Sequence, residues 1–324
     1  MLGIDMGSNT LRAVLMDENF NKLKSEEFII GTAKNMQNET ISDEAIERIF
    51  NALKSLKEKK YDLSQAKAVA TAAFRKAKNT QTIFEKIKKE FKLEVKLIDA
   101  KSEAKLSILG MNERLKILKI FRKDLSYCDL GGASCEISND KFSKSYDFGI
   151  ISFYERMHFK AIKSNSCVKL FKKYPQNLKH IKDEKLKLHF SPYPSHLKQL
   201  MFEAFNISKN IKKELKGKFF VLNSGVPTTL CAYKQAIKYE DYLEDSVNGK
   251  ILKRKDFLNF ALKIWNLEQE KAKIYLGDNR KKYLIAGALL LYTLFDKEKL
   301  IIIDDGIREG VCIAHFKNIS YKGI

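Results

Sequence analysis

The sequence predicts an α/β protein built from two similar halves, each with a mixed sheet covered by helices. Residues 5–10 and 129–134 repeat one pattern 124 positions apart: an acidic residue ends an apolar run, and glycine, small polar residues and a second apolar run follow. Strand-like and helix-like stretches alternate after the first repeat, which favours helices on the faces of a sheet. A chain of 324 residues is also long for one core, so we expect two domains.

The first half begins with three strands and continues with alternating helices and strands. Ser42 and the two acids after it are typical of a helix start, and apolar residues recur at helical spacing from residue 46 to residue 56. The expected elements are strands at 2–4, 11–16 and 27–30, the helix from Ser42, a strand at 68–71, a helix at 80–91, a strand at 93–98 and a helix at 102–115.

The second half opens with two strands that flank the second turn. From Gly149 to about residue 191 the sequence is Lys-rich and interrupted by prolines, which predicts irregular structure. The expected elements are strands at 125–128, 135–137 and 143–148, a helix at 195–215, a strand at 219–222, a helix after the turn at 224–229, helices near 253–265 and 279–295, a strand at 300–303 and a helix from 307.

No low-complexity linker separates the two halves. We therefore expect one domain at 1–120 and a second at 121–324, which share a rigid cleft. The last helix, at about 307–318, is expected to pack back on the first domain.

The charge of the chain favours an anionic partner. Lys and Arg outnumber Asp and Glu by 60 to 40, which gives a net charge of +20, and residues 159–218 hold fifteen Lys against four acids. A Lys-rich solvated surface would also explain this excess. The basic stretch lacks a nucleic-acid-binding motif, so we expect no nucleic acid partner, and a long phosphate chain or a highly phosphorylated nucleotide fits better.

Cysteine usage and hydropathy predict a cytoplasmic protein. The five cysteines are scattered without metal-ligand spacing, which favours reduced thiols. The start of the sequence lacks the pattern of a signal peptide, and the longest apolar run, residues 283–295, is too short for a membrane span. We therefore expect no contact with a membrane.

The two repeated turns have the composition of a phosphate and metal site. Backbone N–H groups of such turns bind anions, and the carboxylates of Asp5 and Asp129 suit Mg²⁺, which needs only one or two protein carboxylates. Glu136 lies seven positions after Asp129, so the returning strand brings it back beside that residue. The alternatives are that each Asp caps its own hairpin and that Glu136 is a surface residue.

Other candidate residues end predicted strands or open predicted helices. Arg75 follows a strand and is suited to a bidentate phosphate contact, although surface Arg is common. Glu103 lies in the first turn of a helix, where Glu often only balances the helix dipole. Ser224 and Gly225 open another helix and are a candidate anion site, and so is the turn near Arg308.

Taken in order, these segments resemble the motifs of the exopolyphosphatase / guanosine pentaphosphate phosphohydrolase family. The matching segments are Gly3-Ile-Asp-Met-Gly-Ser-Asn-Thr-Leu-Arg12, Ala70-Thr-Ala-Ala-Phe-Arg75, Ser102-Glu-Ala-Lys-Leu106, Asp129-Leu-Gly-Gly-Ala-Ser-Cys-Glu136, Ser224-Gly-Val-Pro-Thr-Thr-Leu230 and Gly306-Ile-Arg-Glu-Gly310. The resemblance implies two ribonuclease-H-like domains of the actin, sugar kinase and Hsp70 superfamily, with the active site in the cleft between them. It also implies the short, two-domain form of the family and makes Glu103 the expected catalytic base. Members of this family are often dimers, so the resemblance allows for a homodimer.

Several positions depart from the family pattern and bear on substrate preference and rate. Ala133 and Cys135 stand where Gly and Thr are usual, a change expected to narrow the second phosphate turn. Ser102 replaces the first of two usual Glu residues, and Ser152 replaces a usual Arg.

These features predict a Mg²⁺-dependent phosphohydrolase that releases the terminal phosphate of inorganic polyphosphate or guanosine pentaphosphate, with the choice between them open. Glu103 would activate the attacking water and Arg75 would add positive charge. The predicted metal ligands are Asp5, Asp129 and Glu136. The predicted phosphate-binding residues are Gly7, Ser8, Asn9, Thr10, Arg12, Gly131, Gly132, Ala133, Ser134, Ser224 and Gly225.

Two other functions stay open on the sequence. The altered residues Ala133 and Ser152 would suit a regulator that binds polyphosphate or an alarmone with little turnover. An ATP-using kinase or ATPase of the same superfamily is disfavoured, because residues 224–228 differ from the Gly-Gly-rich adenosine turn of such proteins.

Overall fold

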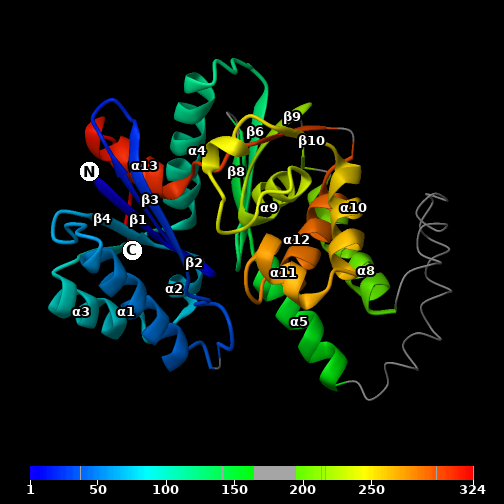
Figure 1. Ribbon diagram of the computed structural model, residues 1–324, viewed down its shortest axis with the longest axis horizontal. Coiled ribbons are helices and arrows are strands. Elements are labelled where there is room, and N and C mark those ends of the chain that lie inside the picture. Colours follow the sequence, from blue (N-terminus) through cyan, green and yellow to red (C-terminus); the bar gives the residue numbers. More distant parts are fainter. Residues whose placement is uncertain are drawn as a thin grey trace.

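The chain folds into two sheets with helices around them (Figure 1). The computed structural model describes residues 1–36, 38–139, 142–163, 195–212, 214–215, 217–296 and 298–323. The first sheet contains β1 (Leu2–Met6), β2 (Thr10–Met16), β3 (Lys22–Ile29), β4 (Lys67–Ala70) and β5 (Val95–Leu97). The second contains β6 (Leu125–Leu130), β7 (Cys135–Ser138), β8 (Ser143–Tyr146), β9 (Phe219–Asn223), β10 (Ile251–Leu252) and β11 (Lys299–Ile302).

The helices lie on both faces of each sheet. Those before the second sheet are α1 (Asp43–Glu58), α2 (Ala72–Lys76), α3 (Thr80–Phe91) and α4 (Ala100–Ile117). Those after its first three strands are α5 (Ile150–Lys163), α8 (Ser195–Ile211), α9 (Gly225–Lys234), the 3₁₀ turn η2 (Glu244–Ser246), α10 (Arg254–Trp265), α11 (Gln269–Leu276), α12 (Lys281–Leu294) and α13 (Ile307–Phe316). No described helix combines the length and the apolar character that crossing a membrane requires.

Both sheets have the same topology. The first has the order β3-β2-β1-β4-β5, with an antiparallel meander β1–β3 and parallel pairs β1–β4 and β4–β5. The second has the order β8-β7-β6-β9-β11, with the same directions, and β10 extends it as an antiparallel strand beside β11. This repeat confirms the predicted α/β fold of two ribonuclease-H-like halves.

The first sheet is buried on both faces because successive side chains of each strand point to opposite sides. Ile4 and Met6 of β1 pack in the core beneath α1 and α3, while Gly3 and Asp5 face the side of α4 and α13. Helix α1 begins at the predicted cap, where the Ser42 hydroxyl accepts a hydrogen bond from the Ala45 N–H.

The second sheet has its main core on the side of α8, α10 and α12, whose inward residues are almost all apolar and buried. Its other face packs against α4 of the first half, through Met111 and Leu115 on Val221 and Ile301. Helix α4 therefore lies between the two sheets and contacts both of them.

Helix α13 returns from the second sheet to the first and lies beside the β1–β2 strands (Figure 1, red). Its packing against α4 is close because each helix has a glycine that lies against the backbone of the other segment. A Cβ on Gly310 would overlap the carbonyl oxygen of Leu106, and a Cβ on Gly110 would overlap that of Gly306. The division of the chain into domains near residue 120 stays a prediction.

Most predicted elements are present, and the main error concerns α5. Residues 149–163 were expected to be irregular, but α5 runs from Ile150 to Lys163. Ile151, Phe153 and Met157 are buried there, and the first N–H groups of the helix bond to the second turn. These tertiary contacts stabilise a helix that the Lys-rich composition conceals. Residues 164–191 of the same predicted segment lie outside the described residues.

Candidate functional site

A cavity of about 830 Å³ lies between the two sheets and is lined by residues from both halves. This volume is within the range typical of small-molecule sites. Both repeated turns contribute to its wall. The lining residues that the sequence predicted are Asp5, Gly7, Ser8, Asn9, Thr10, Arg12, Glu103, Asp129, Gly131, Gly132, Ser134, Glu136, Ser224, Gly225 and Arg308.

The two turns have the same geometry. The Gly7 N–H donates to the Thr10 carbonyl at 2.9 Å, and the Gly131 N–H donates to the Ser134 carbonyl at 3.0 Å. They also meet: a Cβ built on Gly132 would lie 2.9 Å from the Ser8 Cβ. The two motifs, distant in sequence, therefore form adjacent parts of one cavity.

The carbonyl groups of both turns are occupied by the segments that follow the hairpins. In the first turn the Ile30 and Gly31 N–H groups both donate to the Asn9 carbonyl at 2.9 Å. In the second the Ile150 N–H donates to the Gly131 carbonyl at 2.9 Å. These bonds fix which way the peptide units of each turn face.

The N–H groups at the tips of the turns are left free for a ligand. Within the described part of the chain, the amides of Ser8, Asn9 and Gly132, which line the cavity, donate to no protein acceptor. Free N–H groups from successive residues of a turn form an anion-binding nest. Ala133, which was predicted to bind phosphate, is buried and does not line the cavity within the described chain, whereas Gly131, Gly132 and Ser134 do.

Carboxylates gather where the two hairpins meet. Asp129 lies directly opposite Glu136 across β6 and β7, as the spacing predicted, and Asp5 lies opposite Arg12 at the equivalent place in the first hairpin. Burial, and then the charge of Glu103, raises the pKa of Asp5 to about 8. Burial raises the pKa of Asp129 to about 7.

The pKa values of the two Glu residues in this group are also raised. Burial raises the pKa of Glu103, against the lowering effect of Arg75. Burial, followed by the charges of Glu103 and Asp129, raises the pKa of Glu136 well above its usual range. Like charges this close favour protonation unless a cation is bound among them.

Serine hydroxyls orient two of these carboxylates. Ser107 on α4 donates to one oxygen of Asp129 at 2.8 Å, and Ser145 on β8 donates to one oxygen of Glu136 at 2.7 Å. Asp5 Oδ1 is buried and has no hydrogen-bond partner among the described residues. The sequence analysis missed both serines, although Ser107 lies one helical turn after Glu103 and so on the same face of α4.

The carboxylates fit a magnesium ion that takes few ligands from the protein. The described residues include no cluster of three or more His, Cys, Asp or Glu placed to hold a metal by themselves. Mg²⁺ usually keeps several waters and binds one or two carboxylates plus substrate phosphate. The unpartnered oxygen of Asp5 is a donor of the type that Mg²⁺ prefers.

Glu103 is held by Arg75 at the edge of the cavity. One Nη of Arg75 donates to Glu103 Oε2 at 2.6 Å and to the Ile98 carbonyl at 3.0 Å. Within the described part of the chain Arg75 does not line the cavity, whereas Glu103 does. The structure therefore places Arg75 behind Glu103, where it leaves the other carboxylate oxygen available.

Arg12 is engaged by acids of the protein itself. It donates to both carboxylate oxygens of Asp304, at 2.7 and 2.8 Å, and lies 3.0 Å from Glu27. Arg308, near the fourth predicted turn, is likewise buried and pairs with Glu309 at 2.6 Å and with Glu244. Both cations line the cavity, but these partners reduce the charge they offer a ligand.

The cavity extends toward α9 and α12. Ser224 and Gly225 lie at the N-terminus of α9 on this wall. Arg280, which the sequence analysis did not select, lies 4.9 Å over the ring of Tyr239, and one Nη lies 3.4 Å from the Thr229 hydroxyl. Nothing in the local sequence marks Arg280, because it reaches the wall through the packing of α11 and α12.

The repeated topology and the shared cavity define an α/β protein of the actin-like, ribonuclease-H-like class. Within that class, the chain belongs to the Ppx/GppA phosphatase family, whose sequence model matches residues 25–318. This match confirms the resemblance found in the motifs.

Solved structures share the whole fold. A Ppx/GppA family member from Aquifex aeolicus aligns with a TM-score of 0.68 and 22% identity, over 99% of this chain and 98% of that one. An exopolyphosphatase from Cytophaga hutchinsonii aligns with a TM-score of 0.72 and 19% identity, over 98% of this chain and 97% of that one. A comparison with curated proteins gave no match.

Proposed function

We propose that this protein is a Mg²⁺-dependent phosphohydrolase that releases the terminal phosphate of inorganic polyphosphate or guanosine pentaphosphate. The observation that carries the proposal is the contact between the two glycine turns, Ser8 against Gly132, beside a group of carboxylates in the same cavity wall. A terminal phosphate between the turns would face free N–H groups from both halves. Membership of a phosphatase family supports the same chemistry.

Glu103 is the proposed general base. Its Oε2 is bound by Arg75, so its other oxygen can orient an attacking water. Burial raises its pKa, which brings a carboxylate closer to the value that suits proton transfer near neutral pH. Arg75 opposes full protonation and keeps the side chain in one orientation.

Asp5, Asp129 and Glu136 are the proposed metal-binding residues, and since no three of the described carboxylates are placed to hold a metal together, part of the set would bind the ion through its waters. Ser107 donates to one oxygen of Asp129, while the hydroxyls of Ser145 and Ser134 both hydrogen-bond to Glu136. A bound Mg²⁺ would neutralise negative charge on the transferred phosphate. Phosphoryl transfer depends mainly on positioning and electrostatics, and the two turns supply both.

The free N–H groups and the family both support the proposed substrate class. Polyphosphate and guanosine pentaphosphate both end in a phosphate joined by an anhydride bond. The cavity is large enough for either chain end. The solved relative from Cytophaga hutchinsonii is described as an exopolyphosphatase, which supports testing polyphosphate first.

Orthophosphate release tests the proposal. Purified protein with Mg²⁺ should release orthophosphate from at least one of the two substrates, and Glu103→Gln should lower kcat by about 100-fold or more, since general-base catalysis contributes that much. Glu90→Gln, at an exposed position on α3, is the matched control and should leave kcat unchanged.

Two outcomes would contradict the proposal. One is near-normal turnover in Glu103→Gln. The other is tight binding of either ligand with no release by the unmodified protein, which would favour the regulatory alternative. ADP formation from ATP would instead favour a kinase or ATPase.

A further inference from the structure

Residues 319–323 lie along the open edge of the first sheet, next to strand β5. Gly323 forms an antiparallel bridge with Ile98, the residue after β5. The Lys96 ammonium donates to the Tyr321 carbonyl at 2.9 Å and lies 4.7 Å over the Tyr321 ring. We call residues 319–323 the edge segment.

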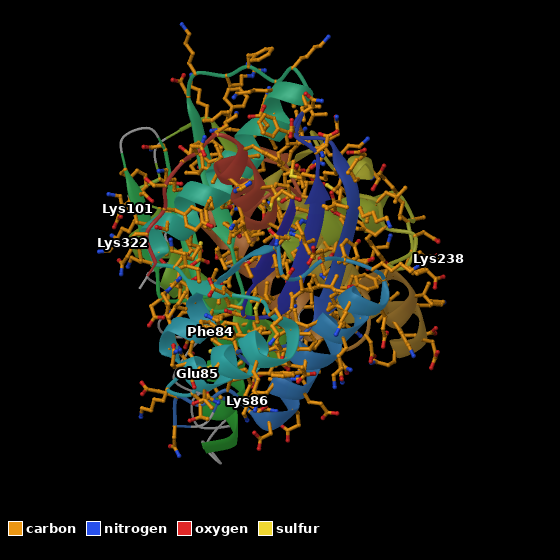
Figure 2. All side chains as sticks on the ribbon, turned by 90° about the vertical axis from the view of Figure 1, so that its left-hand side faces the viewer. Phe84, Glu85, Lys86, Lys101, Lys238 and Lys322 are labelled. Carbon is orange, nitrogen blue, oxygen red and sulfur yellow. The ribbon has the colours of Figure 1, made fainter. Side chains whose placement is uncertain are left out.

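The edge segment also binds the first turn of α4. The Lys322 N–H donates to the Ser102 hydroxyl at 2.9 Å, and Ser102 is only 5% exposed. The Lys105 ammonium donates to the Ser320 carbonyl at 2.9 Å. Figure 2 shows Lys322 beside Lys101 of α4 at one side of the molecule.

Apolar contacts anchor the edge segment between β5 and α4. Ile319 and Tyr321 pack on a cluster that contains Ile98 and Leu106. Leu106 lies on α4, one turn after Ser102, so the segment contacts the helix at successive turns. Polar and apolar contacts together fix the segment on the start of α4.

These contacts involve residues next to the Arg75–Glu103 pair. Ser102, which accepts the Lys322 N–H, immediately precedes Glu103. Ile98, which pairs with Gly323, accepts a hydrogen bond from Arg75 through its carbonyl, and Arg75 holds Glu103. The edge segment thus contacts the neighbours of both members of the pair, yet it lies outside the cavity.

We infer that the edge segment is a positioning element, which holds α4 and Ile98 so that Arg75 and Glu103 keep their relative orientation. It touches neither the phosphate turns nor the carboxylates of the proposed metal site in the described structure. Loss of its contacts should therefore affect the catalytic step more than ligand binding. This role rests on the proposed function of Glu103.

Full-length variants test the inference. Ser102→Ala removes the acceptor of the Lys322 N–H, and Tyr321→Ala removes the packing of the segment. Each should lower kcat about tenfold, because a small misplacement of a reacting group is costly, and should leave KM within about twofold. Ser102→Thr retains the hydroxyl and should recover most of kcat.

Lys317→Ala is the control, because Lys317 lies close by in sequence but pairs with Glu113 instead. It should leave kcat and KM unchanged. Amide exchange at residues 102–104 gives a readout that does not need activity, and Tyr321→Ala should accelerate it. The inference would be overturned by a normal kcat in both Ala variants. It would also be overturned if these variants changed KM alone, or if amide exchange in Tyr321→Ala were unchanged.

The same experiment separates this inference from the proposed function. If the unmodified protein releases no phosphate, the proposed function fails, and the exchange measurement alone decides whether the edge segment fixes the start of α4. If the unmodified protein is active, the kcat and KM values decide the positioning role.

Discussion

Asp5 and Asp129 carry the strongest physical sign of a ligand, because both are half-buried carboxylates in the cavity wall that the protein leaves incompletely paired. Among the described residues, the Asp129 carboxylate accepts a hydrogen bond from Ser107, and Asp5 Oδ1 has no partner. Burying a charge without compensation is costly, so a cation or a proton is needed there. A structural role as hairpin caps would not explain this arrangement.

These two groups make stability depend on pH when no metal is bound. The folded protein binds their protons more tightly than the unfolded chain does, since burial raises the pKa from 3.8 to about 8 for Asp5 and to about 7 for Asp129. Below about pH 4 both groups are protonated in the folded and the unfolded protein, and their stabilising contribution is complete. It is lost as the pH rises through their pKa values in the folded protein. Urea unfolding of the metal-free protein should show the free energy of unfolding falling between pH 5 and 8.

Each group can contribute a slope of at most about 1.4 kcal/mol per pH unit. Asp129→Asn cannot ionise and should make the profile shallower, whereas the exposed control Glu90→Gln should not. Added Mg²⁺ should flatten the profile by binding the ionised form. A flat profile for the unmodified protein, or an unchanged slope in Asp129→Asn, would count against the carboxylate site.

At the scale of elements, α4 connects the sheets and the site. It carries Glu103 and Ser107, packs on the second sheet through Met111, and lies against α13 where Gly310 faces the Leu106 carbonyl. Its position therefore depends on contacts from both halves. A substitution that disturbs the α4–α13 contact should therefore lower the free energy of unfolding.

Gly310→Ala tests this contact. The added methyl group would overlap the Leu106 carbonyl, and overpacking of this kind costs about 2 kcal/mol. Thermal or denaturant unfolding should show that loss, whereas His315→Ala, an exposed position on the same helix, should change stability little. Equal stability of the two variants would mean that the close approach of the helices is unimportant.

The sequence predicted elements well where the signal was local. The two turns, the Ser42 cap and the opposition of Asp129 and Glu136 depend on short-range patterns and are present. Helix α5 was missed because its stability comes from contacts with the second turn. The short helices α2 and α11 were missed because each has few residues to show a period.

At the scale of the molecule, the partners of the predicted cations could not be found from sequence. Arg12 pairs with Asp304, 292 residues away. Lys22, which was not among the predicted residues, lies 3.0 Å from Asp305 and 3.1 Å from Glu309. These partly buried pairs link β2 and β3 to the start of α13 and to the residues just before it. No local pattern reports contacts over such separations, so Arg12 was predicted as a free phosphate ligand.

Three predicted features lie beyond what the described residues test. Most of the Lys-rich stretch, residues 164–194, is outside them, so its proposed affinity for a long anionic chain stays a prediction. The same holds for a homodimer and for the choice between polyphosphate and guanosine pentaphosphate. The four described cysteines, at positions 128, 135, 231 and 312, are free and buried.

The central claim is that the two glycine turns bind one terminal phosphate between them. A crystal structure of the Glu103→Gln protein with triphosphate and Mg²⁺ tests it most directly. We expect the terminal phosphate to lie between residues 7–10 and 131–134 and to accept hydrogen bonds from N–H groups of both turns, with the metal beside Asp5 and Asp129. Triphosphate bound to one turn alone, or elsewhere in the cavity, would contradict it.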